Sequence, residues 1–231
     1  MKVTFIQHSC FLVETERFYY LFDYEKGQLP ELDGNKPIYV LASHGHYDHY
    51  NPDIFFLLKQ SGMKYIHGVL SDDIVIPDDT DILQVSHSKE YELNEKLRLT
   101  TFQSTDLGVA FLIEDEHQLI YHAGDLNDWV WDEESDDYNQ QMTLDYQKQI
   151  LLLKNKLDGR TLDTAFVVLD PRQEKDYDRG LCTFLNSVSV QHVYPMHTWN
   201  TPSIIDAFIK DHPQYTSQII KCEEKEVHHE I

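Results

Sequence analysis

Three histidines and an aspartate lie within six residues of one another, where a predicted strand gives way to a predicted helix. They are His44, His46, Asp48 and His49. Imidazole and carboxylate groups packed this closely compete for hydrogen-bond partners and for water unless a cation holds them together. Gly45 lets the loop turn tightly enough for alternate side chains to converge. The segment therefore predicts a fold that gathers a strand end, a loop and a helix start around a divalent metal ion.

Short strands dominate the first half of the chain. They are rich in Val, Ile, Phe, Tyr and Leu and are predicted at 3–15, 18–24, 37–42, 64–70, 82–86, 96–102, 109–115 and 118–123. Helices are predicted at 51–60, 138–157 and 201–210. Two further strands, at 164–169 and 192–195, separate the later helices. This order favours sheets covered by helices within one domain spanning residues 1–231, although it does not by itself determine how the sheets pack.

The chain is strongly acidic, with 40 Asp and Glu residues against 19 Lys and Arg residues and a formal net charge of −21. Such a surface repels nucleic-acid phosphates and anionic membranes, so a small-molecule substrate is the expected partner. No apolar run approaches the roughly 20 residues that cross a bilayer. The three cysteines are widely spaced and are expected to be reduced thiols, which favours the cytoplasm. The sequence does not predict an oligomeric state.

The H-x-H-x-D-H pattern of residues 44–49 resembles the signature of the metallo-β-lactamase-fold hydrolase superfamily. Three other segments resemble that family in the same order along the chain, namely residues 7–14 (QHSCFLVE), 121–125 (YHAGD) and 194–197 (YPMH). Together they cover essentially the whole chain, and the first of them is similar to the lactonase-like and uncharacterised hydrolase branches. The resemblance implies an α/β fold, a four-layer αββα sandwich with metal at one edge between its two sheets.

The resemblance also implies which residues bind metal. His44 and His46 would serve a first ion. Asp48, His49 and His197 would serve a second ion, and Asp125 would bridge the two. A water shared by two divalent ions has its pKa lowered to about 7 and becomes a nucleophile at neutral pH. Asp48 would be the catalytic residue that orients this water. Zinc is the expected metal, with manganese and iron as alternatives.

The sequence departs from the family pattern at one place. The family normally supplies a third histidine to the first metal from a loop between central strands, and residues 102–109 contain no histidine. Asp106 or a water could replace it, the first site could be weak, or the protein could hold a single ion. The last alternative is favoured, with a site formed by Asp48, His49, Asp125 and His197.

Four other residues are weaker candidates for contacts to the metal ligands or the substrate. By resemblance His8 lies close to the metal cleft, with a hydrogen-bonded core histidine as the alternative. Asp23, at the end of a predicted strand, could brace a metal-binding histidine. Trp129 could line a substrate pocket or pack a helix onto a sheet. Arg172 could bind an anionic substrate group, but the many carboxylates nearby favour an ion pair instead.

Two functions of different classes fit these observations. The first is a metal-dependent hydrolase acting on a lactone, ester, amide or phosphoester. The second is a catalytically inactive relative that binds a ligand or partner, and the missing histidine is its only support. A protein that had lost catalysis would have no reason to keep the other metal-ligand residues at their family positions, which favours the hydrolase. A nuclease conflicts with the net charge of −21.

Overall fold

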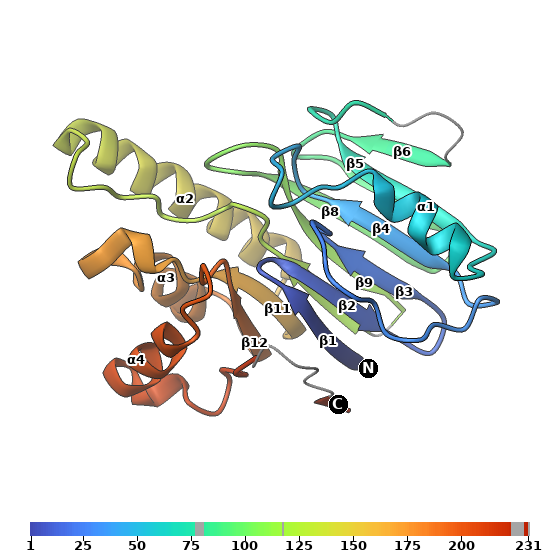
Figure 1. The fold of residues 1–231 in the computed structure, drawn as a ribbon. Helices are drawn as coiled ribbons and strands as arrows, with labels where there is room; N and C mark the ends of the chain where they lie inside the picture. The colour runs from blue at the N-terminus through green and yellow to red at the C-terminus, as the bar shows by residue number, and fades with distance from the viewer. Residues whose placement is uncertain (77–80, 117, 223–228, 231) are drawn as a thin grey trace. The chain divides into compact units, whose positions relative to one another are not determined.

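The computed structural model of the chain describes residues 1–76, 81–116, 118–222 and 229–230 (Figure 1). The chain divides into two compact units. Unit 1 comprises Met1–Ser86 with Cys222–Ile231, and unit 2 comprises His87–Lys221. Each unit is built on one sheet with helices packed on it. That both units belong to a single domain, as the sequence suggests, stays a prediction.

Unit 1 contains a seven-stranded sheet in the order β13-β1-β2-β3-β4-β5-β6. Its strands are β1 (Lys2–Gln7), β2 (Cys10–Glu14), β3 (Tyr19–Phe22), β4 (Ile38–Ala42), β5 (Ile66–Ser71), β6 (Ile82–Val85) and β13 (His229–Glu230). The strands from β3 to β6 run parallel. Because parallel strands end at the same edge, Asp23 after β3 and Ser43 after β4 lie side by side. This edge carries the His-rich loop.

Helix α1 (Asp53–Gln60) follows that loop and packs onto the sheet of unit 1. It buries Ile54, Phe55 and Leu58, which recur on one helical face. Gly68 of β5 makes room for the helix, because a Cβ at this position would lie 3.0 Å from the Phe55 ring and 2.7 Å from Ile82. The helix therefore anchors the far end of the His-rich loop.

Unit 2 contains a six-stranded sheet in the order β12-β11-β10-β9-β8-β7. Its strands are β7 (Glu90–Asn94), β8 (Leu97–Gln103), β9 (Val109–Asp115), β10 (Gln118–His122), β11 (Leu162–Val168) and β12 (Val190–Met196). The strands β10, β11 and β12 run parallel. Asp125, Asp170 and His197 follow the carboxyl ends of these three strands, so the topology brings them to one edge.

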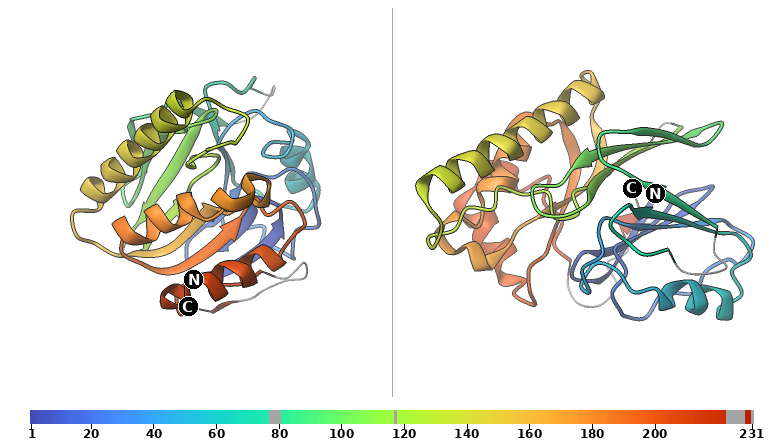
Figure 2. Two further views of the ribbon diagram at one scale, coloured as in Figure 1. Left: turned by 90° about the vertical axis from the view of Figure 1, so that its left-hand side faces the viewer. Right: turned by 90° about the horizontal axis from the view of Figure 1, so that it is seen from above.

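The helices of unit 2 are α2 (Asp136–Leu157), α3 (Arg179–Ser187) and α4 (Ser203–Asp211), with short 3₁₀ helices η1 (Pro171–Asp176) and η2 (Pro213–Tyr215). Helix α2 packs against β8, α3 packs against β11, and the two helices contact each other (Figure 2). Ser135 caps α2 by accepting a hydrogen bond from the Tyr138 N–H at 3.2 Å. These helices cover the sheet that carries the second group of candidate residues.

Some sequence predictions were wrong in detail. The strand predicted over 3–15 is two strands, because His8 turns the chain between β1 and β2 with a φ of 49°. Strand β7 was not predicted, because three of its five side chains are polar and none of the five is fully buried. Helix α3 was also missed, because Gly180 in its first turn hides a helical pattern. A Cβ at Gly180 would lie 1.8 Å from the Asn127 side chain, so the packing requires glycine there.

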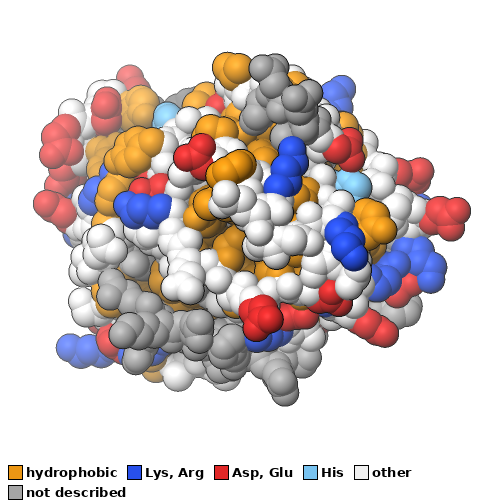
Figure 3. Space-filling view, turned by 45° about the vertical axis from the view of Figure 1, so that its right-hand side comes forward, with side chains coloured by type: hydrophobic (Ala, Val, Ile, Leu, Met, Phe, Trp, Pro, Cys, Tyr) orange, Lys and Arg blue, Asp and Glu red, His pale blue; other side chains and the backbone are white. Residues whose placement is uncertain are grey.

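No helix among the described residues is long and apolar enough to span a membrane. Lys and Arg side chains on the face drawn in Figure 3 are interspersed with Asp and Glu side chains. Cys10, Cys182 and Cys222 are free thiols. The cytoplasmic location expected from the sequence stays a prediction.

Candidate metal centre

The first group of candidate ligands lies on the His-rich loop of unit 1, between β4 and α1. His44 and His49 are buried, Asp48 is partly buried and His46 is exposed. The loop is closed by a hydrogen bond from the His49 N–H to the His46 carbonyl at 3.0 Å. Gly45 also donates its N–H to the Asp73 carboxylate at 2.7 Å. The loop is thus held in shape by its own backbone and by a neighbouring loop.

Asp23 orients two histidines of this loop. Its carboxylate accepts hydrogen bonds from the Ser43 N–H at 2.7 Å, the Ser43 hydroxyl at 2.7 Å and His49 Nδ1 at 2.8 Å. Because the Ser43 hydroxyl donates to Asp23, neutral His44 must donate its Nδ1–H to Ser43 Oγ, 3.0 Å away. Both histidines then carry their ring lone pair on Nε2, the arrangement found when a carboxylate orients a metal-binding histidine. The contact between Asp23 and a histidine is the one that the sequence suggested.

The spacing of the donor atoms in unit 1 suits a metal ion. His44 Nε2 and His46 Nδ1 lie 3.0 Å apart, near the roughly 3.3 Å between two nitrogen ligands of a tetrahedral zinc ion. His8 Nε2 lies 3.6 Å from Asp48 Oδ2, and its ring meets the His49 ring nearly at right angles. One ligand atom from each of His8, Asp48 and His49 lies within 4.8 Å of the others. Nitrogen and carboxylate donors of this kind fit zinc, manganese or iron.

The second group of candidate residues surrounds Asp170 in unit 2. The Asp170 carboxylate bonds with His197 Nδ1 at 2.9 Å, with the Trp199 indole N–H at 3.2 Å and with the Arg172 guanidinium at 2.9 and 3.0 Å. Burial alone would raise the pKa of Asp170, but hydrogen bonds from His197 and Arg172 outweigh it and lower the pKa to about 2. An ionised Asp170 accepts a hydrogen bond from the N–H at His197 Nδ1. His197 Nε2 lies 3.5 Å from Asp125 Oδ1.

Three of these residues have a left-handed backbone, with φ of 49° at His8, 44° at Asp23 and 63° at His197. For residues other than glycine this conformation costs about 1–3 kcal/mol and persists only where the surroundings hold it. Asp23 and His197 belong to the two buried carboxylate–histidine pairs. The backbone strain therefore coincides with the candidate ligands and the carboxylates that orient them.

Asp170 was not among the candidates from the sequence. It lies two residues after the buried strand β11 and precedes Pro171, much as Asp23 follows β3 and Asp125 follows β10. A carboxylate at the end of a parallel strand is the signal that could have identified it.

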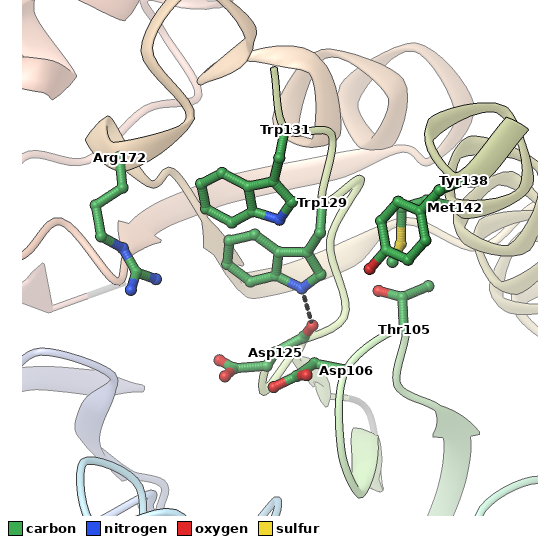
Figure 4. Close-up of a pocket in the computed structure, with 8 residues that line it drawn as sticks. All are labelled: Thr105, Asp106, Asp125, Trp129, Trp131, Tyr138, Met142 and Arg172. Atoms are coloured by element: carbon green, nitrogen blue, oxygen red, sulfur yellow. Dashed lines mark hydrogen bonds between the residues drawn. The ribbon is translucent and has the colours of Figure 1, made fainter. Parts of the chain in front are cut away.

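A cavity of about 150 Å³ lies beside Asp125 in unit 2 (Figure 4). Trp129 and Trp131 stack in parallel on its wall, with ring centroids 5.9 Å apart and planes 4° apart. The Trp129 indole N–H donates to the Asp125 carbonyl at 2.8 Å, and its ring meets the His197 ring at a centroid distance of 5.7 Å. The other lining residues are Thr105, Asp106, Tyr138, Met142 and Arg172. Trp129 thus lines the pocket and also positions Asp125.

Two weaker candidates also line this cavity. Asp106 is exposed, and a carboxylate oxygen of it lies within 4.8 Å of one on Asp125. This position fits the alternative in which Asp106 replaces the family's missing histidine. Arg172 pairs with Asp170 and stacks over the Trp199 ring at 4.3 Å. The ion pair that the neighbouring carboxylates favoured is therefore present.

Each unit brings its own candidate ligands together. In unit 1 these are His44, His46, Asp48 and His49. In unit 2, Asp125 lies beside His197. That ligands of both units serve the same ion stays a prediction.

The arrangement of strands and helices is that of the metallo-β-lactamase fold. The metallo hydrolase Igni18 from the archaeon Ignicoccus hospitalis matches with a TM-score of 0.67 and 16% identity, over 100% of this chain and 98% of that chain. The metallo-β-lactamase fold protein YhfI from Bacillus subtilis matches with a TM-score of 0.62 and 14% identity, over 99% and 98% of the two chains. The fold class predicted from the sequence is confirmed.

The chain belongs to the beta-lactamase superfamily, because the model of the beta-lactamase superfamily domain matches residues 2–141. A UPF0173 metal-dependent hydrolase from Carboxydothermus hydrogenoformans is 38% identical over 76 residues. The match covers 29% of this chain and 30% of that relative, so it spans less than a third of the relative's length. The family resemblance seen in the motifs is confirmed, and this relative is named a metal-dependent hydrolase, the class expected from the sequence.

Proposed function

We propose that this protein is a metal-dependent hydrolase that cleaves a small lactone, ester, amide or phosphoester. The observation that carries the proposal is the presence of two buried carboxylate–histidine pairs, Asp23 with His49 and Asp170 with His197. A carboxylate on Nδ1 fixes the histidine tautomer that presents Nε2 to a metal and makes it a stronger ligand. The family assignment and the name of the relative from Carboxydothermus support the same conclusion.

The proposed ligands are those that the resemblance implies, namely His44, His46, Asp48, His49, Asp125 and His197. Zinc is preferred among the divalent ions because imidazole outnumbers carboxylate in this set. When bound, such an ion polarises the substrate's carbonyl or phosphoryl oxygen and lowers the pKa of a coordinated water to about 7.

The side chains around these ligands have separate tasks in the proposed reaction. Asp48 accepts a hydrogen bond from the attacking water and orients it, and His8, 3.6 Å away, positions the Asp48 carboxylate. Trp129 holds the Asp125 backbone through its indole N–H. The cavity of about 150 Å³ is smaller than the roughly 300–1,000 Å³ of complete ligand pockets. It suits one flat apolar group of a small substrate, stacked against the tryptophans.

Metal analysis combined with a substrate screen tests the proposal. Protein purified without chelator is expected to contain zinc, manganese or iron, and to hydrolyse a member of a lactone, ester, amide and phosphodiester panel. Asp48→Ala and Asp125→Ala should each lower activity by more than about 100-fold, because even partners of the ligands cost about 10–100-fold. Glu31→Ala removes an exposed carboxylate and serves as the matched control. Full activity after chelation and dialysis would contradict the proposal.

The same experiment separates catalysis from simple binding. A correctly folded wild-type protein that takes up no zinc or manganese after supplementation would support the alternative, a module that binds a ligand or partner. The absence of a third histidine between residues 102 and 109 is the feature that keeps this alternative open.

A further inference from the structure

A second cluster of metal-binding side chain types lies in unit 2, outside the candidate metal centre. It consists of Asp178, Cys182 and His212, whose ligand atoms lie within 4.8 Å of one another. Asp178 precedes α3, and Cys182 lies one turn into this helix, where its N–H donates to the Asp178 carbonyl at 2.8 Å. His212 follows α4. All three side chains are partly exposed, so an ion in solution can reach them.

The carboxylate of Asp178 contacts one ring nitrogen of His212, whereas the thiol of Cys182 lies close to both. Asp178 Oδ2 lies 2.6 Å from Nε2, and Cys182 Sγ lies 3.6 Å from Nε2 and 3.8 Å from Nδ1. In a catalytic Cys–His–Asp relay the thiol pairs with the nitrogen opposite the carboxylate, here Nδ1, which is the more distant of the two nitrogens from Cys182 Sγ. One ligand atom from each of the three side chains lies within 4.8 Å of the others, so a rotation of the Cys182 side chain towards Nε2 brings all three around one ion.

The separations fit a tetrahedral zinc ion. Zinc lies about 2.3 Å from a thiolate sulfur and 2.0–2.1 Å from an imidazole nitrogen, so these two ligand atoms are about 3.6 Å apart. The distance from Cys182 Sγ to His212 Nε2 is 3.6 Å. The hydrogen bond between His212 and Asp178 must open to about 3.4 Å when its proton leaves. Their side chains are 23% and 24% exposed and have room for this movement.

The surroundings orient the imidazole and keep the thiol unreactive. The His212 ring packs on Phe208 at a centroid distance of 4.8 Å and near Tyr215 at 6.3 Å. Burial, together with the charge of Asp178, raises the pKa of Cys182 to about 11. A neutral thiol is a poor nucleophile, whereas a metal ion deprotonates a thiol that coordinates it.

We propose that Asp178, Cys182 and His212 form a second cation site, selective for zinc and other thiophilic divalent ions, with water as the fourth ligand. On binding, the Cys182 thiol loses its proton to water, and the His212 proton moves through water from Nε2 to Nδ1. The site joins the start of α3 to the end of α4, and none of its residues belongs to the family's ligand set. It is independent of the hydrolase proposal.

Cobalt(II) is the probe for this site, added to the full chain. A thiolate ligand gives cobalt a charge-transfer band in the near ultraviolet, and the candidate metal centre contains no cysteine among its proposed ligands. The wild-type protein is expected to show this band, and Cys182→Ser is expected to lose it. Cys222→Ser is the matched control, because it removes a thiol outside the proposed site and should keep the band.

A second variant keeps the Cys182 thiol, so that a loss of cobalt binding can be distinguished from a failure to fold. Asp178→Asn preserves shape and should weaken cobalt binding by at least about 10-fold, with an unchanged circular dichroism spectrum. A wild-type protein without the band at saturating cobalt overturns the proposal, and so does a band that persists in Cys182→Ser.

Discussion

The two carboxylate–histidine pairs share one design but differ in their other partners. In unit 1, Asp23 binds His49 and also accepts two hydrogen bonds from Ser43, which is fully buried. In unit 2, Asp170 binds His197 and also pairs with Arg172, whose side chain is 48% exposed. The Ser43 donors have no path to water, whereas the Arg172 guanidinium can turn towards solvent. The same contact to a histidine is therefore harder to replace in unit 1.

The largest effect is expected for Asp23→Asn. The amide places an NH₂ group where one oxygen accepted from Ser43 or His49, so two buried donors face each other. Zinc affinity should fall by about 10–100-fold and stability by about 2 kcal/mol. Competition with a chromophoric chelator and urea unfolding measure the two quantities. Glu31→Gln is the control, and wild-type zinc affinity in Asp23→Asn would show that Asp23 does not orient a ligand.

Asp170→Asn should have a smaller effect on stability. It also removes the carboxylate from His197, so zinc affinity should fall by about 10-fold or more. The free energy of unfolding should fall by only about 1 kcal/mol, because Arg172 can exchange its partner for water. The same chelator competition and urea unfolding apply. A stability loss greater than that of Asp23→Asn would contradict the conclusion that the carboxylate–histidine contact is harder to replace in unit 1.

The smallest effect is expected for Arg172→Gln, and it should depend on pH. The folded-state pKa of Asp170, about 2, lies below its ordinary value of 3.8. The hydrogen bonds from His197 and Arg172 that lower this pKa therefore stabilise the fold above about pH 4, and this contribution, including the part from Arg172, is lost as the pH falls towards about 2. Urea unfolding of chelator-treated protein should show a deficit of about 0.5 kcal/mol at neutral pH that narrows near pH 3. A deficit that stays constant with pH would contradict this origin.

The sequence predicted an element correctly where its signal comes from residues close together in the chain, and missed it where the element depends on distant contacts. Helices α1 and α2 end at the residues predicted, Gln60 and Leu157, because apolar periodicity and end signals act within a few turns. Helix α3 was missed because Gly180, which weakens its helical pattern, is required by packing against Asn127, a residue far away in the chain. Strand β7 pairs with β8 through its backbone, and only Tyr91 and Leu93 give it an apolar face, which is too short a signal to identify a strand.

The sequence by itself determined the donor types, because His44, His46, Asp48 and His49 are neighbours along one loop and need no long-range packing to meet. Only the tertiary structure decided that Asp170 binds His197, 27 residues away, and that Cys182 lies beside His212, 30 residues away. Parallel strands end at one edge of a sheet, and packed helices bring their ends together. Contacts of this kind depend on chain geometry that no short motif records.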